Sequence, residues 1–246
     1  MISLEKMQKC ARPRRYADGK PRPLFRGVIH VVQSMVIVGC LVAGTAAQSW
    51  TFALALVFKL LTYAASATFH IYPFSSVAGV TNAFIADLLC VPCTAIGAVT
   101  AFVPEVDGAI IAREAGIAVT TLALNALAVL YQTRGQIGLQ TRVDRTDAPR
   151  SVITGAYSIW AFTFVGLSSG FDELWGAMVG LTVAAVLLST PVTKAHEEEP
   201  TLTWPARPVW HVKGVWSLHE DFHLILAGAD VVWLLMVLRR RALYDN

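Results

Sequence analysis

The pentapeptide HEDFH, residues 219–223, places two histidines four residues apart in the last apolar stretch of the chain. On a helix, side chains at positions i and i+4 share one face and lie about 6 Å apart. This spacing is a common way for one helix to offer two imidazoles to one metal ion. His219 and His223 are therefore candidate metal ligands.

Three more polar residues stand in other apolar stretches: Ser66 and His70, one turn apart, and Asp87. A carboxylate at the centre of a membrane helix costs roughly 2.5–3.5 kcal/mol on insertion scales, so Asp87 must be paired, protonated or in contact with water. His70 would complete the set of three protein ligands that catalytic zinc uses, with a fourth position left for water. Three neutral imidazoles suit Zn²⁺, with Co, Ni or Fe as alternatives. Asp87 could then orient that water or take its proton, and Ser66 could donate a hydrogen bond to the water or to a substrate oxyanion.

The composition indicates which elements must position these residues. The chain has 246 residues, of which 55% are hydrophobic and 15% charged, and this is the composition of an integral membrane protein. Seven stretches are long enough to cross about 30 Å of hydrocarbon as helices. They are residues 27–47, 50–72, 79–103, 108–131, 151–170, 174–193 and 215–238. The sequence therefore predicts an all-α, seven-transmembrane helix bundle as one domain (27–238), after a basic N-terminal segment (1–26) and before a short C-terminal tail (239–246).

The distribution of Lys and Arg predicts the orientation of this bundle. Fifteen of these residues fall on the side of the N-terminus and four on the opposite side, three of them Arg239, Arg240 and Arg241. Cytosolic loops carry an excess of Lys and Arg, so we expect the N-terminus in the cytosol and the C-terminus across the membrane. The basic N-terminus is explained as a topology signal that also touches anionic lipid, and no nucleic-acid partner is needed.

With this topology, His70, Asp87, His219 and His223 fall in one layer near the cytosolic surface, although they come from three helices. A scatter of tolerated polar residues would not converge in this way. His30 stands at the cytosolic end of the first stretch and has two interpretations: an interfacial histidine, or a residue that supports a site at that depth.

The positions of Lys59 and Asp230 predict a second contact between the helix that carries His70 and the helix that carries His219. Each lies eleven residues from a candidate ligand, Lys59 from His70 and Asp230 from His219. Because the two helices run antiparallel, both residues lie about 16 Å farther from the cytosolic surface than these histidines. We predict that they form an ion pair.

Cys90 and Cys93, in the motif CVPC, could indicate metal or redox chemistry, but the motif stands alone and packing beside Pro92 explains it better.

These pieces together resemble the hemolysin III and progestin/adiponectin receptor (PAQR) family, part of a superfamily that includes the alkaline ceramidases. The matching pieces are KPRPLFRGVIH, SATFH, the Asp of the third stretch and HEDFH. The resemblance implies that His70, His219 and His223 bind zinc, with Asp87 and Ser66 as the accompanying polar residues. It also implies a lipid-facing cavity and, for some members, hydrolysis of ceramide-like amides, whereas other members are described as receptors.

Two functions follow, both with a membrane lipid as substrate or ligand: a zinc-dependent lipid amide hydrolase, and a non-catalytic receptor or sensor in which zinc joins helices. A third alternative is an intramembrane metalloprotease, because HEDFH fits HExxH with Glu220 as general base. A protease would need a third ligand farther along the chain, where only the rest of the same helix and RRRALYDN follow. A pore has little support, since no row of charges follows one path through several stretches.

Overall fold

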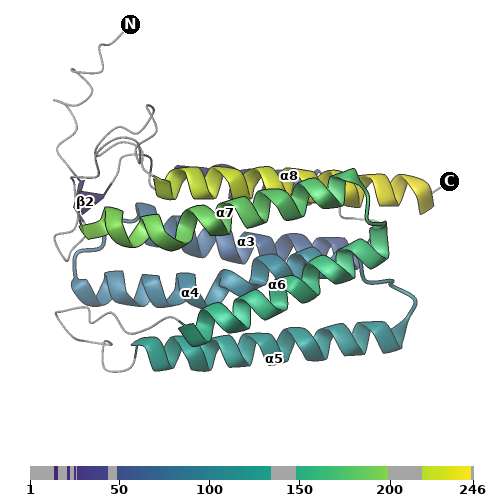
Figure 1. The fold of residues 1–246 in the computed structure, drawn as a ribbon, viewed down its shortest axis with the longest axis horizontal. Coiled ribbons are helices and arrows are strands. Elements are labelled where there is room, and N and C mark those ends of the chain that lie inside the picture. Colours follow the sequence, from purple (N-terminus) through teal and green to yellow (C-terminus); the bar gives the residue numbers. More distant parts are fainter. Residues whose placement is uncertain are drawn as a thin grey trace, which may run out of the picture.

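The computed structural model describes residues 14–15, 21–22, 25, 27–43, 49–133, 148–198 and 218–244. Within these residues the chain forms seven helices and two very short strands (Figure 1). The strands, β1 (Arg14–Arg15) and β2 (Pro21–Arg22), pair antiparallel. The helices are α2 (Val28–Val42), α3 (Trp50–Ile71), α4 (Val77–Thr100), α5 (Gly108–Thr133), α6 (Ala148–Ser169), α7 (Glu173–Glu198) and α8 (Leu218–Tyr244). Each of the seven predicted stretches overlaps one of these helices, which confirms the all-α class.

Five of the described helices are long and apolar enough to cross a membrane: α3, α4, α5, α6 from Val152 on, and α8 from Glu220 to Leu243. Helix α2 and the Glu173–Leu187 part of α7 are apolar but shorter. These lengths and compositions are those expected of a multi-pass integral membrane protein. The number of seven crossings and the side of each terminus remain predictions.

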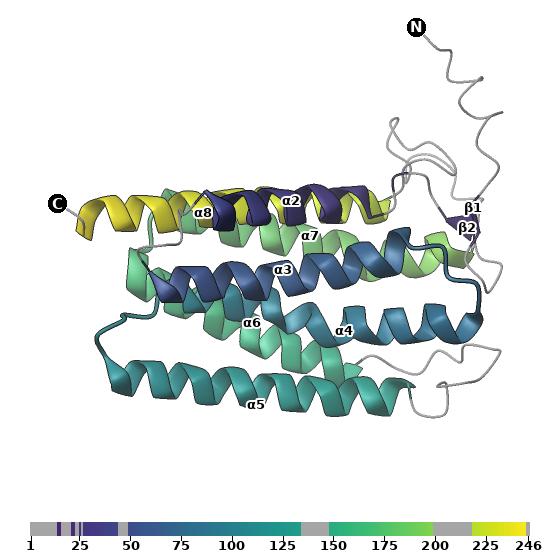
Figure 2. The same cartoon turned by 180° about the vertical axis from the view of Figure 1, so that it is seen from behind.

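The helices run side by side along the long axis of the molecule (Figures 1 and 2). In both views α8 lies along one edge of the bundle and α5 along the opposite edge, with α3 and α4 between them. Helix α3 packs against α2 and α4, and α7 packs against α8. Because successive helices reverse direction, the start of α2, the end of α3 and the start of α8 meet at one end of the bundle.

The surface of this bundle is more apolar than that of a water-soluble protein, and its largely apolar interior also encloses polar side chains. Large apolar side chains are exposed along the helices, as Val32, Met35 and Val42 of α2 show. Polar side chains lie inside, among them Lys59 and Asn125, which are 3% and 0% exposed. Hydrocarbon solvates an apolar surface well, whereas polar groups inside a membrane face the bundle interior and pair with one another. The interior polar groups are therefore where a site should be sought.

Pro92 lies inside α4 and explains one of these interior polar contacts. Proline has no N–H group, so the carbonyl of Leu88, four residues earlier, loses its partner in the helix. The side-chain amide of Asn125 on α5 donates to this carbonyl at 3.2 Å and to the carbonyl of Leu89 at 3.3 Å. The Asn125 side chain thus restores a hydrogen bond that the sequence of α4 removes, and it ties α5 to α4.

The end of the bundle where α8 finishes is held by arginines. Arg239 pairs with Asp172 at 2.7 Å, and Arg240 donates to the carbonyl of Phe102 at 2.8 Å. Arg241 lies over the ring of Phe52, with 4.8 Å between its guanidinium carbon and the ring centroid. The sequence predicts that these three arginines lie on the side of the membrane that has few Lys and Arg residues. Each of them has a partner within the protein.

Candidate metal centre

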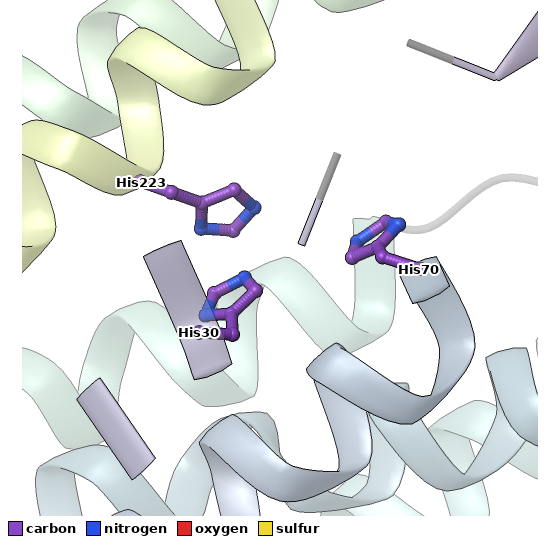
Figure 3. Close-up of side chains that lie close together, drawn as sticks. All are labelled: His30, His70 and His223. Carbon is purple, nitrogen blue, oxygen red and sulfur yellow. The ribbon is translucent and has the colours of Figure 1, made fainter. Parts of the chain in front are cut away.

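Three histidines from three helices meet at the end of the bundle where α2 and α8 begin (Figure 3). His30 lies in the first turn of α2, His70 in the last turn of α3 and His223 in the second turn of α8. One ring nitrogen of each histidine lies within 4.8 Å of the corresponding nitrogens of the other two. Among the His, Cys, Asp and Glu residues that the structure describes, these three form the group that could hold a metal ion.

The three rings are close and enclosed. The ring centroids of His30 and His223 are 4.1 Å apart, and that of His70 lies 6.1 Å from each of them. His30 and His70 are each 4% exposed, and His223 is half-buried. Nitrogens bound to one tetrahedral zinc at about 2.0–2.1 Å lie about 3.3 Å from one another. The observed spacing exceeds this by about 1.5 Å at most, a distance that small ring rotations can cover.

Gly27 permits the close approach of α2 to the end of α3. It precedes the first residue of α2 and has a φ of +84°, a left-handed conformation that favours glycine. A Cβ atom at this position would lie 2.7 Å from the Cβ of His70. The missing side chain therefore lets the first turn of α2 pack directly against His70, which brings His30 beside it.

The hydrogen bonds of His30 suit a metal ligand. Its Nδ1 atom lies 3.2 Å from the side-chain carbonyl oxygen of Gln33, one turn along α2. Its Nε2 atom is buried and has no hydrogen-bond partner among the described residues. A buried nitrogen without a partner is uncommon in proteins, and a metal ion would account for this one.

The structure bears differently on the five residues predicted for the site. It brings His70 and His223 together, as predicted, and adds His30, which the sequence left open between two interpretations. The side chain of His219 lies outside the described residues, although its backbone belongs to α8. The assignment of His219 as a ligand therefore remains a prediction.

The two predicted polar companions occupy different depths. Ser66 is 4% exposed and lies one turn before His70 on α3. Asp87 is half-buried in the third turn of α4, and it does not belong to the group of clustered ligand atoms. The roles predicted for these two residues remain predictions. Glu220, the candidate base of a metalloprotease, is 1% exposed and is also absent from the cluster.

The predicted ion pair between Lys59 and Asp230 is present. The Lys59 Nζ atom lies 2.5 Å from Asp230 Oδ1, and it also lies 4.3 Å from the ring centroid of Trp233. The second carboxylate oxygen, Oδ2, accepts hydrogen bonds from the hydroxyl of Tyr63 and from the amide nitrogen of Gln33, the latter at 3.1 Å. Gln33 therefore contacts both the ion pair and His30.

The two cysteines of the CVPC motif lie on either side of Val91 and Pro92 in α4. Cys90 and Cys93 are both free, and neither belongs to the candidate metal group. Cys93 is 5% exposed and counts among the buried apolar residues.

Comparisons with protein-family models, with curated proteins and with solved structures give no match to this chain. What the site can do is therefore judged from its own chemistry. Neutral imidazole nitrogens are ligands for Zn²⁺ and for several other transition metals. Three of them from one protein leave room for a fourth ligand on a tetrahedral ion, which is the arrangement of catalytic rather than structural zinc sites.

Proposed function

We propose that this chain is a zinc-dependent hydrolase of membrane lipids that cleaves an amide bond, and that it belongs with the hemolysin III and PAQR proteins it resembles. The observation that carries the proposal is the convergence of His30, His70 and His223 at one end of an apolar helix bundle. Polar side chains in an apolar bundle cost free energy, and a bound metal ion would offset this cost for two buried imidazoles and one half-buried imidazole that lie together.

In this proposal His70 and His223 hold the ion together with a third histidine, either His30, which the structure places beside them, or His219, which the sequence predicts, and the fourth position is left for water. Zinc, when bound, supplies a Lewis acid that makes water a better nucleophile near neutral pH. Asp87 would accept the proton that the attacking water loses and would return it to the amide nitrogen as the C–N bond breaks and the amine leaves. Ser66 would donate a hydrogen bond to the carbonyl oxygen of the amide as negative charge develops there.

The depth of the site favours a lipid amide as substrate. His30 is the third residue of α2, and His223 is the sixth residue of α8. At 1.5 Å per residue, both lie within about 8 Å of the helix ends. The amide of a ceramide-like lipid links its headgroup region to its acyl chain, so it lies at a similar depth in one leaflet. A substrate of this kind would reach the site from the bilayer.

The alternative is a non-catalytic receptor or sensor in which zinc is structural. One observation favours it: the three clustered histidines come from α2, α3 and α8, so a metal ion would join three helices. In that case the lipid would be a ligand, and removal of the metal would loosen the bundle without loss of any turnover.

One experiment separates the two functions. The purified chain, in lipid nanodiscs, is analysed for zinc and incubated with ceramides of several acyl-chain lengths, and release of fatty acid is measured. We expect zinc and turnover in the wild type, loss of both in His223→Ala, and loss of turnover alone in Asp87→Ala. His196→Ala, which changes a histidine that the sequence places among glutamates, is the matched control and should behave as wild type. A wild-type protein that carries zinc but hydrolyses no ceramide would refute the hydrolase and support the receptor.

A further inference from the structure

A chain of hydrogen bonds links His30 to the ion pair on α3 and α8. The Asp230 carboxylate accepts from the Gln33 amide nitrogen at 3.1 Å, and the Gln33 carbonyl oxygen lies 3.2 Å from His30 Nδ1. Lys59, which is 3% exposed, lies 2.5 Å from the other oxygen of Asp230. The side chains of α2, α3 and α8 thus form one connected network beside the candidate metal centre.

The donors and acceptors in this network determine its direction. A carboxylate that faces a buried lysine is ionised, and an ionised carboxylate can only accept hydrogen bonds. Gln33 must therefore turn its NH₂ group towards Asp230, which leaves its carbonyl oxygen facing His30. Because an amide oxygen also only accepts, Nδ1 of His30 must carry the ring hydrogen. A neutral imidazole with a hydrogen on Nδ1 has its lone pair on Nε2.

We propose that Asp230 and Gln33 are positioning residues of the metal centre, which fix the tautomer and ring orientation of His30 so that Nε2 is presented to the ion. The inference rests on the proposed metal site and deepens it. In known metal sites a ligand histidine usually donates its other ring N–H to a carboxylate or a carbonyl group. Here the Gln33 amide lies between the histidine and the carboxylate. Asp230 fixes the orientation of this amide, and the amide in turn fixes the ring hydrogen of His30 on Nδ1.

The position of His30 supports this arrangement. Its Nε2 atom is buried without a partner among the described residues, so the nitrogen that the network leaves free is also the one that lacks a hydrogen bond. The ring of Tyr63 stacks on that of His30, with 5.9 Å between centroids and 17° between planes. The Tyr63 hydroxyl donates to Asp230 as well, so the same carboxylate is tied to the residue that supports the His30 ring.

The tautomer can be measured without any metal. The chain is prepared metal-free in nanodiscs with ¹⁵N-labelled histidine, and the ring nitrogens of His30 are assigned by their loss in His30→Gln. We expect wild-type His30 to carry its hydrogen on Nδ1, and this preference to be lost in Gln33→Leu. In Asp230→Asn, the new amide can donate to Gln33, whose own amide can then turn and donate to Nδ1, so the Nδ1–H fraction should fall. A wild-type hydrogen on Nε2, or a preference unchanged in Gln33→Leu, would overturn the proposal.

Metal affinity provides the second readout, by competition of the chain with a chelating dye for Zn²⁺ or Co²⁺. Gln33→Leu leaves the ion pair intact and should weaken binding about 10- to 100-fold. Ser34→Ala, the matched control on the adjacent residue of α2, removes a buried hydroxyl without a partner among the described residues and should leave the affinity unchanged. Equal affinity of Gln33→Leu and wild type would contradict the proposed role.

The double variant Lys59→Met, Asp230→Leu separates positioning from stability. It removes both charges, so we expect its free energy of unfolding to approach that of wild type. Its metal affinity should remain below that of wild type. Recovery of both properties would show that Asp230 acts only through the fold. If the wild type binds neither Zn²⁺ nor Co²⁺, the proposed metal centre fails, and the tautomer measured in the metal-free chain still decides whether the hydrogen-bond chain exists.

Discussion

Lys59 of α3 and Asp230 of α8 form an ion pair in the interior of the bundle, with 2.5 Å between Nζ and Oδ1. The Lys59 side chain is 3% exposed and that of Asp230 21%. Two charges in an apolar bundle each carry a large desolvation cost, and their mutual attraction and further hydrogen bonds offset it. Asp230 receives those further bonds from Tyr63 and Gln33.

Lys59→Met should destabilise the protein by about 3–5 kcal/mol, because it leaves the carboxylate of Asp230 without its counter-charge. Lys59→Met, Asp230→Leu should recover most of this loss. The free energy of unfolding in bicelles is the quantity to measure. Arg239→Ala is the control: it breaks a pair in which the arginine side chain is 60% exposed, and it should cost about 1 kcal/mol or less. Strictly additive losses from the two single changes at Lys59 and Asp230 would refute the coupling.

Asn125→Leu should cost about 1–3 kcal/mol, because the carbonyl that Pro92 deprives of its helical partner would lose its replacement. Thr121→Val is a control on the same helix, since the Thr121 hydroxyl donates only to Ile117 within α5. In a Pro92→Ala background the carbonyl of Leu88 can regain its partner in α4, so Asn125→Leu should cost less there. A cost that is the same in both backgrounds would contradict this account of the contact between Asn125 and the carbonyl of Leu88.

The positions of the helices could be predicted from the sequence because each apolar stretch is bounded by polar or glycine- and proline-containing segments. Their ends could not, since hydropathy reports the part of a helix that suits hydrocarbon and not the whole helix. Helix α7 continues to Glu198, beyond the predicted end at 193, and α8 continues to Tyr244 through three arginines. Arg, Lys and Glu are good helix formers, so a helix can continue beyond its apolar part.

Part of the candidate site could also be predicted from the sequence. Comparison of depths along antiparallel helices correctly placed His70 and His223 in one layer, and the same comparison predicted the pair of Lys59 and Asp230. His30 lies at that depth too, but a lone imidazole at a helix end is equally typical of an interfacial residue. Which helices are neighbours depends on packing, and the packing of α2 against α3 and α8 is what places His30 beside His70 and His223.

Gly27→Ala should weaken metal binding. The new Cβ would meet the Cβ of His70 at 2.7 Å, in a backbone conformation that disfavours alanine, so α2 and His70 would have to move apart. Gly39→Ala is the matched control on α2, because no atom lies within 4 Å of the added Cβ. Its effect on metal affinity should be negligible. Equal affinities of the two variants, measured by chelator competition, would show that the close approach at Gly27 has no role in the site.

The carboxylate of Glu105 should give the protein a pH-dependent contribution to its stability. Burial raises the pKa of this group, but hydrogen bonds from Ser49 and Thr51 and the charge of Arg241 outweigh burial and hold the pKa below its ordinary value of 4.5. A carboxyl group with a depressed pKa stabilises the fold above its unfolded pKa, and the contribution is lost as the pH falls through the folded pKa.

The difference in melting temperature between wild type and Glu105→Gln should therefore favour wild type at neutral pH and shrink below about pH 4.5. Thermal unfolding at several pH values between 3 and 7 would measure it. A difference that does not change with pH would mean that the charge of Glu105 contributes nothing to the end of the bundle where α3 begins.

The zinc content of the purified chain, measured by mass spectrometry against protein concentration, tests the metal centre most directly. We expect about one zinc ion per chain for three imidazole ligands at one site, and loss of that zinc when His30, His70 and His223 are all changed to alanine. His196→Ala should retain it. A wild-type chain without any bound transition metal after purification in zinc-supplemented buffer, or a triple variant that still binds one ion, would contradict the account.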